Sequence, residues 1–468
     1  MEGLSRRHAA MLGGAASLVL LISPAHSAGF ALMEQSASGL GNAYAGAGAS
    51  AEDASTVWWN PAAMSRLPAG KQLAFSLHSI MPSTTFHNGA STSGTGTALN
   101  GEGGDAGRSA MTPAGYFVTD LAPRWKFGLG VNVPFGLSTA YDANWIGRFQ
   151  GIEAKVETLN VNPSVSWALN DTVSLGAGID WQSAKIGLLT GANYGAGWAG
   201  VLAGGVAAGA LTAAGAAALS PLAPLGTEGQ NRVSLEGDAW GYNLGAHIKL
   251  SSATQLGLAY RSSLKYKLTG TTTFTGRPTL AGLPAGAAAL GSAFNGATAD
   301  GSVALTLKTP DSISASVSHW VNDRWQLLGD LTWTGWSKIQ SIPLTRDTTG
   351  GTLDTLTFNF RDTLRTSFGA NYRYSDAWTL RAGYAIDESP VSNAESRTVR
   401  LPDNDRQWFS IGAQYRVSRS GTVNLAYAHL VVKDSTINNN QTATGKGLVN
   451  GTYNGKVDLL AAQFTYAF

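Results

Sequence analysis

The sequence predicts an all-β protein: a 14-stranded antiparallel transmembrane β-barrel whose N-terminal segment folds into the lumen as a hatch, or plug. Apolar and polar residues alternate along most of the chain after residue 70, which is the period of strands with two different faces. Short and long connections follow one another in strict order along this region. After residue 30, polar residues or glycines interrupt every apolar run before eighteen residues, so we expect no membrane-spanning helix.

The first 27 residues are typical of a cleaved export signal. Arg6 and Arg7 precede an apolar run from Met11 to Ile22, which is too short to span a bilayer. The small residues Ala25 and Ser27 predict cleavage between Ser27 and Ala28. An outward-facing apolar barrel cannot be carried folded through water, so we expect export in the unfolded state by the general secretory route.

Residues 28–70 form the predicted hatch. The segment is rich in small residues and has no sustained strand alternation, and residues 32–46 allow a short helix that ends at a glycine. A flexible periplasmic tail is the alternative, but Phe30, Trp58 and Trp59 would then expose large rings to water. Asn60–Pro61–Ala62 follows the two tryptophans and is a turn signal.

The barrel is predicted over residues 71–468. Residues 355–374 show its alternation, with apolar residues at even positions such as Leu356 and Leu364. The odd positions include Arg361 and Arg365, which we therefore place on the lumen face of one strand of roughly twenty residues. Asp362 breaks the pattern, which indicates a bulge or a rim position.

The connections give the strand count. Six are tight, and they lie at 121–124, 169–172, 250–254, 321–324, 374–377 and 417–421. Seven are long, and they lie at about 83–108, 138–150, 190–231, 271–300, 340–352, 388–404 and 437–450. Thirteen connections join fourteen strands, and an even number places both termini on the periplasmic side of an outer membrane.

The third strand contains a predicted interruption. It reads WKFGLGVNVPFGLSTA, with Pro134, Phe135 and Gly136 near its middle. Proline cannot donate to a ladder and glycine weakens a strand. A closed barrel accepts both only by bending inward and leaving backbone unpaired.

Aromatic residues mark the periplasmic end. Tryptophans lie within a few residues of the tight turns, at 125, 167, 320, 325 and 378. An interfacial girdle explains them better than ordinary core packing. The chain ends QFTYAF, which is similar to the signal that the barrel-insertion machinery recognises.

Two long connections are apolar. Residues 190–231 and 276–297 are rich in alanine, glycine and leucine and could form helices above the barrel. Exposed apolar loops usually indicate a binding surface. Helices that only pack together and cap the barrel are the alternative.

Composition excludes several functions. The net charge of +2 gives no basic field for nucleic acid. The chain has no cysteine, and its seven histidines are scattered, so we predict no metal site, no cofactor and no catalytic residues. An outer-membrane enzyme would need a nucleophile, base and orienter together, and no Ser–His pairing is visible.

The segment AGFALMEQSASGLGNAYAG…AEDASTVWWNPAAMSRL resembles the hatch of the FadL-type family, and the blocks at 307–337 and 401–418 are similar to that family's barrel. The resemblance covers essentially the whole mature chain. It implies passive uptake of a hydrophobic small molecule, long-chain fatty acid or neutral hydrocarbon, from surface loops to a lumen pocket. It also implies lateral exit into outer-membrane lipid at Pro134, Phe135 and Gly136, with Asn60–Pro61–Ala62 near that kink. We expect a monomer.

The same resemblance suggests the ligand path. It implies that Phe30 approaches the ligand and that Trp58 and Trp59 line an apolar path; packing of the hatch against the barrel explains the two tryptophans equally well. It also implies that basic residues hold a carboxylate near the fifth and tenth strands. Leu188 and Leu356 stand at those two places, which favours a neutral ligand. A polar-solute porin and an adhesin remain alternatives, but a porin has no hatch and an adhesin has no reason for a kinked strand.

Overall fold

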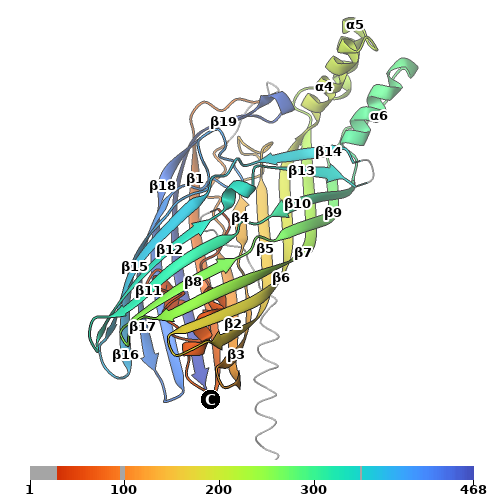
Figure 1. Ribbon diagram of the computed structural model, residues 1–468. Helices are drawn as coiled ribbons and strands as arrows, with labels where there is room; N and C mark the ends of the chain where they lie inside the picture. Colours follow the sequence, from red (N-terminus) through yellow and green to blue (C-terminus); the bar gives the residue numbers. More distant parts are fainter. Residues whose placement is uncertain (1–28, 95–100, 348–349) are drawn as a thin grey trace, which may run out of the picture.

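The computed structural model describes residues 29–94, 101–347 and 350–468 (Figure 1). The predicted export signal and the cleavage site between Ser27 and Ala28 lie outside the described residues. One antiparallel sheet contains nineteen strand segments and closes on itself, because β1 pairs with β19 from Gln72 to Asn88.

The nineteen segments trace fourteen strands, because five strands are divided in two. The undivided strands are β1 (Lys71–Asn88), β2 (Ala110–Ala122), β5 (Glu153–Ala168), β6 (Val173–Asn193), β7 (Glu228–Lys249), β16 (Trp378–Asp387), β17 (Arg406–Arg416), β18 (Gly421–Gln441) and β19 (Gly447–Ala467). The divided strands are β3 (Trp125–Asn132) with β4 (Gly136–Ala140), β8 (Thr254–Arg261) with β9 (Lys265–Thr275), β10 (Gly301–Lys308) with β11 (Ser312–Trp320), β12 (Trp325–Thr334) with β13 (Ser341–Arg346), and β14 (Thr352–Thr357) with β15 (Thr363–Arg373).

The predicted strand number and the alternation of turns are confirmed. Tight turns lie at one end of the barrel and long connections at the other, and the C-terminus lies at the tight-turn end (Figure 1). The Lys71 amide donates to the Phe468 carbonyl at 2.9 Å, so the first and last strands meet at that end. The final connection is shorter than predicted, because β18 and β19 continue to Gln441 and from Gly447.

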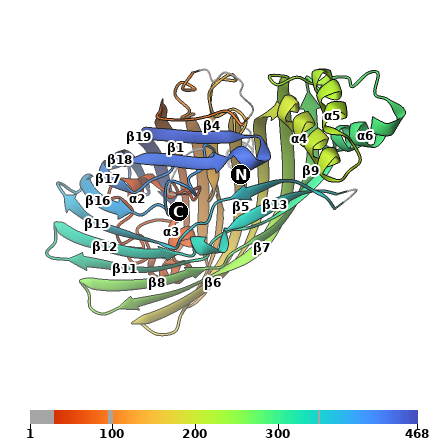
Figure 2. The same cartoon turned by 90° about the horizontal axis from the view of Figure 1, so that it is seen from above.

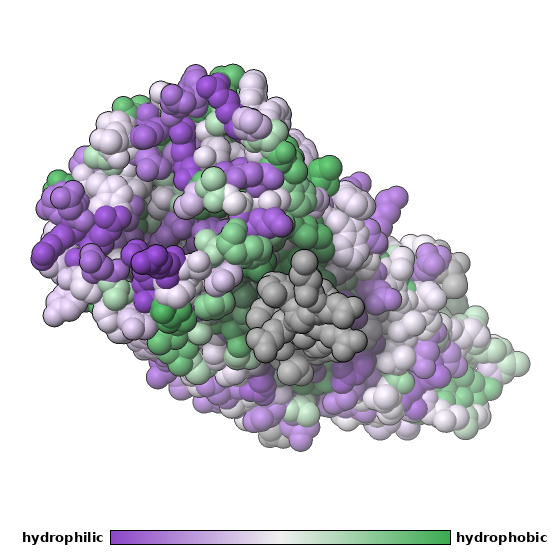
Figure 3. All heavy atoms as spheres, turned by 90° about the horizontal axis from the view of Figure 1, so that it is seen from below, coloured by the Kyte–Doolittle hydropathy of each residue, from purple (hydrophilic) through white to green (hydrophobic). Residues whose placement is uncertain are grey.

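The outer wall is apolar. Leucine, isoleucine and phenylalanine side chains are exposed along it and alternate with buried positions, as at Leu425 and Leu460. Near the tight turns, Trp125 stacks on Trp167 with ring centroids 5.5 Å apart. Seen from that end, hydrophilic and hydrophobic side chains both reach the surface (Figure 3). An apolar wall with tryptophans near the tight turns is typical of a barrel in a bilayer.

The prediction of one continuous strand over 355–374 is wrong. β14 ends at Thr357 and β15 begins at Thr363. Asn359, between them, has a φ of 49°, a left-handed conformation that ends a strand. The break exchanges the faces, so that Leu356 is buried inside while Leu364 is exposed on the wall.

The hatch lies inside the ring of strands (Figure 2). It contains α2 (Ala37–Leu40), α3 (Thr56–Trp59) and the 3-10 helix η2 (Pro61–Arg66), and α2 ends at Gly41 as the sequence indicates. Strand glycines give it room. A Cβ on Gly176 would lie 2.3 Å from the Ala62 nitrogen, and one on Gly245 would lie 2.0 Å from the Asn60 Oδ1.

Helices rise above the long-connection end (Figure 1). They are α4 (Tyr194–Ala207), α5 (Ala213–Leu219), η3 (Ser220–Leu222), η4 (Ala285–Ala287) and α6 (Ala288–Ala297); two further short turns are η5 (Trp336–Lys338) and η6 (Thr442–Thr444). Trp198 and Phe294 pack edge to face at 5.6 Å, so α4 and α6 support each other. None of the described helices is long and apolar enough to cross a membrane.

Candidate functional site

The wall is interrupted at the third strand, as predicted. Residues between β3 and β4 leave the ladder. β2 pairs with β3 only from Gly115, so its residues Ala110–Ala114 pair with β1 alone. β4 pairs with β5, and its other side makes a single bridge, from Thr139 to Gly107. The ladder is therefore missing between β2 and the kink.

The start of the hatch takes the place of that ladder. The Leu32 amide donates to the Pro134 carbonyl at 2.8 Å, and the Gly136 amide donates to the Phe30 carbonyl at 2.9 Å. The Phe135 amide donates to the Thr158 Oγ1 at 3.0 Å. The kink is thus held by the hatch on one side and by a β5 side chain on the other.

Apolar side chains fill the lumen beside the kink. We call the buried apolar residues packed around Phe30, Phe135, Leu188, Trp336, Leu356 and Leu401 the lumen apolar cluster. Phe30 lies between two rings of this cluster, 5.6 Å from Phe135 and 4.8 Å from Trp336. The breaks in other strands contribute Leu264, Trp336 and Phe360, because residues that leave a ladder can turn their side chains inward.

The hatch tryptophans pack within the plug and against the wall. The Arg261 guanidinium lies 3.6 Å from the Trp58 ring centroid, and its Nη2 donates to the Trp58 carbonyl at 2.8 Å. Trp59 contacts Tyr44, with ring centroids 5.1 Å apart. Neither tryptophan belongs to the lumen apolar cluster.

Asn60–Pro61–Ala62 is an anchor of the hatch. Asn60 is completely buried, and its Nδ2 donates to the Gly48 and Ala246 carbonyls at 2.8 and 3.0 Å. Its Oδ1 accepts from the Ala62 amide and so starts the helical turn η2. The strand glycines that admit this turn lie on β6 and β7, whereas Phe30 and Leu32 meet the kink.

The two arginines placed together by the parity argument are in different surroundings. Arg365 is buried on the inner face, and its Nη2 donates to the Ala43 carbonyl of the hatch at 3.0 Å. Arg361 lies in the break between β14 and β15, where its half-exposed side chain is 3.5 Å from Asp405. The parity argument fails for Arg361 because the break removes it from the strand.

Buried polar side chains lie where the hatch meets β15, β16 and β17. Glu34 is 1% exposed, and neither of its carboxylate oxygens accepts a hydrogen bond from another described residue. Burial raises the pKa of Glu34 to about 7, and Arg406 and Arg365 offset part of that shift. This region suits water or structural ion pairs better than an apolar ligand.

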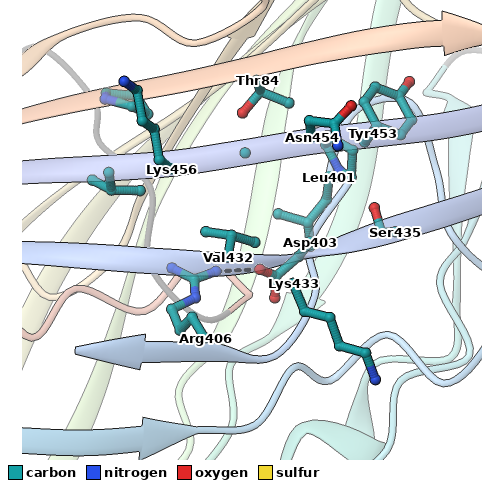
Figure 4. A pocket seen from close by; sticks show the side chains of 14 residues that line it. Thr84, Leu401, Asp403, Arg406, Val432, Lys433, Ser435, Tyr453, Asn454 and Lys456 are labelled. Carbon is teal, nitrogen blue, oxygen red and sulfur yellow. Dashed lines mark hydrogen bonds and ion pairs between the residues drawn. The ribbon is translucent and has the colours of Figure 1, made fainter.

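A pocket in the wall is too small for a large ligand. It lies beside the bulge of β18 between Val432 and Ser435, is lined by Thr84, Asp403, Arg406, Tyr453 and Lys456 among others, and has a volume of about 40 Å³ (Figure 4). That volume holds a few water molecules. Asp403 in this pocket accepts the Gly29 amide at 2.9 Å and is ion-paired with Arg406.

Sequence reasoning missed the partners of the N-terminal residues. Trp336 and Asp403 hold Phe30 and Gly29, but both come from distant parts of the chain. Pairing across more than three hundred residues leaves no periodic signal. By contrast, the pattern of strand glycines could have indicated a close approach of the hatch.

A closed fourteen-stranded barrel with an apolar wall, tight turns at one end and a hatch in its lumen defines an outer-membrane transport protein. A family model described as "Outer membrane protein transport protein (OMPP1/FadL/TodX)" matches residues 18–468. The chain belongs to this family, is located in the outer membrane, and is a transporter rather than an enzyme.

The relatives and solved structures agree with this assignment. The chain is 30% identical to the long-chain fatty acid transport protein of Salmonella typhi over 462 residues, 97% of each chain. It is also 30% identical to the putative outer membrane protein NMB0088 of Neisseria meningitidis over 465 residues, 95% of each.

Among solved structures, a Pseudomonas aeruginosa FadL homologue is similar with a TM-score of 0.82 and 28% identity, covering 94% of this chain and all of that one. The Pseudomonas putida toluene transporter TodX shares the fold, with a TM-score of 0.65, 19% identity and the same coverage.

Proposed function

We propose that this protein carries hydrophobic small molecules passively across the outer membrane and releases them sideways into the lipid. The ligand lands on the apolar helices α4, α5 and α6, enters the lumen apolar cluster, and leaves through the wall at Pro134, Phe135 and Gly136. The single observation that carries the proposal is the position of two rings of the cluster: Phe135 is part of the kink, and Phe30 is bonded to it through its carbonyl.

The capture step is supported by the composition of the outer helices. Residues 194–226 contain no charged side chain. Trp198 and Leu202 are buried between helices, while Val206 and Leu225 remain exposed. An exposed apolar surface beside the membrane offers a weak landing site for an apolar solute.

The exit step is supported by the free-energy cost of moving an apolar solute through water. The hatch fills the periplasmic end of the lumen, and Asn60 ties it to the wall. An apolar molecule that left through water would lose about 25 cal/mol for each Å² of surface exposed. A gap in the wall beside the kink lets it pass from the cluster to lipid without that cost.

The ligand class follows from the lining and the relatives. Leu188 and Leu356 stand in the cluster and offer only apolar contacts. The enterobacterial relative is a long-chain fatty acid transport protein, and the TodX structure is that of a toluene transporter. We therefore assign long-chain fatty acids or neutral hydrocarbons as the ligand class.

Uptake by cells that lack their own hydrophobic-compound transporters tests this function. Expression of the protein should raise uptake of labelled oleic acid or labelled toluene severalfold, while influx of a labelled disaccharide stays at background. Sugar influx without hydrophobic uptake would instead support a polar-solute porin. A Phe468 deletion that blocks barrel insertion provides the background.

A further inference from the structure

Three exposed lysines stand together on the outer wall of the barrel. Lys265 and Lys267 lie at the start of β9 and Lys308 at the end of β10, and these two strands lie toward the long-connection end (Figure 1). Lys265 is directly opposite Lys308 in the ladder between the two strands. The alternate residues Tyr266 and Leu307 are buried in the lumen apolar cluster, so the lysines point outward. We call Lys265, Lys267 and Lys308 the wall lysine group.

The outer face changes from apolar to polar at the wall lysine group. On the side of the tight turns, the other halves of the same two strands expose Leu258 and Ile313. The rings of Tyr242 and Tyr260 lie there with centroids 5.9 Å apart. On the other side of the lysines, the exposed residues of β9 are threonines, at 269, 271, 273 and 275. Such a change from apolar and aromatic side chains to polar ones is typical of the boundary of the membrane.

The length of the strand agrees with this level. Trp320 ends β11 at a tight turn, and Lys308 is twelve residues away from it along the same strand. At about 3.3 Å per residue and a tilt of about 40°, these residues rise by roughly 30 Å. The hydrocarbon core of a bilayer is about 30 Å thick. The wall lysine group therefore lies at the level of the lipid head groups in the outer leaflet.

The protein leaves the charge of the wall lysine group uncompensated. Among the residues that the structure describes, none of its three ammonium groups has a carboxylate within ion-pair distance. The adjacent outer face of β7 exposes Glu236 and Asp238, and Lys185 of β6 lies opposite Glu236. Positive charges therefore outnumber negative ones on this part of the wall. Like charges directly opposite each other in a ladder are unfavourable, so Lys265 and Lys308 favour an anion between them.

We propose that the wall lysine group binds a phosphate of lipid A, the phosphorylated glycolipid anchor of lipopolysaccharide in the outer leaflet. Acyl chains of the same molecule lie along the apolar wall at Leu258 and Ile313. Each ammonium group presents three donors to the phosphate oxygens and interacts with them as a point charge. The site is on the outside of the barrel, so it is separate from the lumen path of the proposed function.

Binding of lipid A to the purified full-length barrel tests the proposal. Native mass spectrometry measures the lipid adducts, and EDTA removes metal ions that could bridge to the phosphate. Lys265→Gln combined with Lys308→Gln should weaken lipid A binding by about tenfold or more, because each basic residue at an anionic lipid surface contributes roughly fivefold. Lipid A from which both phosphates have been removed should bind the wild-type barrel with a similar loss.

Two further variants separate the charge of the site from general effects. Lys71→Gln combined with Lys249→Gln removes the same charge from exposed positions at the tight-turn end. It should leave affinity within about twofold, because that end lies beyond the reach of screened charges. Lys265→Arg combined with Lys308→Arg keeps both charges and should retain affinity within about threefold.

Three results would overturn the site. These are equal affinity for intact and dephosphorylated lipid A, equal losses in the two glutamine double variants, and phosphatidylglycerol binding as tight as that of lipid A. The last result would show a general surface for anionic lipids. All of the substituted side chains are exposed, so each variant should migrate as a folded barrel in unheated gel samples.

Discussion

At the residue scale, Phe30 connects three parts of the molecule. Its ring lies against Phe135 of the kink and against Trp336, which lies in the break between β12 and β13. Its carbonyl accepts a hydrogen bond from the Gly136 amide. Asp403 holds the preceding residue through the Gly29 amide. A side chain near the start of the hatch thus joins the lumen apolar cluster to the kink of the third strand.

We predict that Phe30→Ala weakens binding of a hydrophobic ligand by roughly tenfold or more. Loss of a buried phenyl ring costs about 3–5 kcal/mol in a packed core, and even half of that exceeds tenfold in affinity. Calorimetry with oleic acid measures the effect. Barrel insertion should not change, because β1 begins only at Lys71.

Leu32→Ala is the matched control. Leu32 is also buried and also bonded to the kink through its backbone, but its side chain packs in a different apolar group with Leu40 and Trp408. Its replacement should leave ligand affinity within about twofold. Equal losses in both variants would mean that the ring of Phe30 has only a packing role.

At the element scale, the third strand is the informative one. Pro134 removes a donor, and the segment between Asn132 and Gly136 bonds to the hatch and to Thr158 instead of to β2. The free edge of β2 at Ala110–Ala114 remains available. The interruption of the strand therefore depends on local chemistry rather than on overall barrel geometry.

We predict that Pro134→Thr combined with Gly136→Val largely abolishes uptake of hydrophobic solutes. The added amide and the β-branched side chain both favour pairing with β2 and fill the opening. Uptake of labelled oleic acid by cells measures the loss, and heat-modifiable migration on a gel reports folding. Wild-type uptake by the folded double variant would disprove the lateral route.

Gly187→Val is the control for this experiment. Gly187 lies in an undivided part of β6, where a Cβ would meet only the Lys155 Cβ at 3.8 Å. A valine there should keep both folding and uptake. A loss of uptake in this control would show that strand glycines matter for folding in general.

At the scale of the whole molecule, the fold determines at which end of the barrel each connection lies. The tight turns and the C-terminus share one end, and α4, α5 and α6 rise from the other (Figure 1). Closure through β1 and β19 leaves no exposed sheet edge at the seam. The apolar wall then sets the depth of the barrel in the membrane.

We predict that single cysteines report this arrangement, because the chain has none of its own. Cysteines at Asn170 and Asp323 should react with an impermeant maleimide only after the outer membrane is opened. A cysteine at Ala210 should react on intact cells. Reaction of Asp323→Cys and Ala210→Cys from the same side would contradict the topology.

The sequence by itself determined the barrel, the hatch and the position of the kink. These features depend on period-two alternation, on turn residues and on Pro134, all of which act within a few residues of the chain. It also placed Phe30, Phe135, Leu188 and Leu356 on the predicted ligand path, and the structure brings these four residues into the lumen apolar cluster; the ligand path itself stays a prediction.

Only the tertiary structure decided which side chains meet inside the barrel. The left-handed backbone at Asn359 lies in a break between β14 and β15, across which the inner and outer faces exchange, and Arg361 lies in that break rather than in a strand. Trp58 packed against Arg261 of the wall, Trp59 packed against Tyr44 within the hatch, and Lys446 and Asp354 met from two separate elements. Such contacts form between residues that are distant in sequence, and their energies depend on burial and approach distance. Local patterning encodes which face a side chain takes, but not which side chain it meets there.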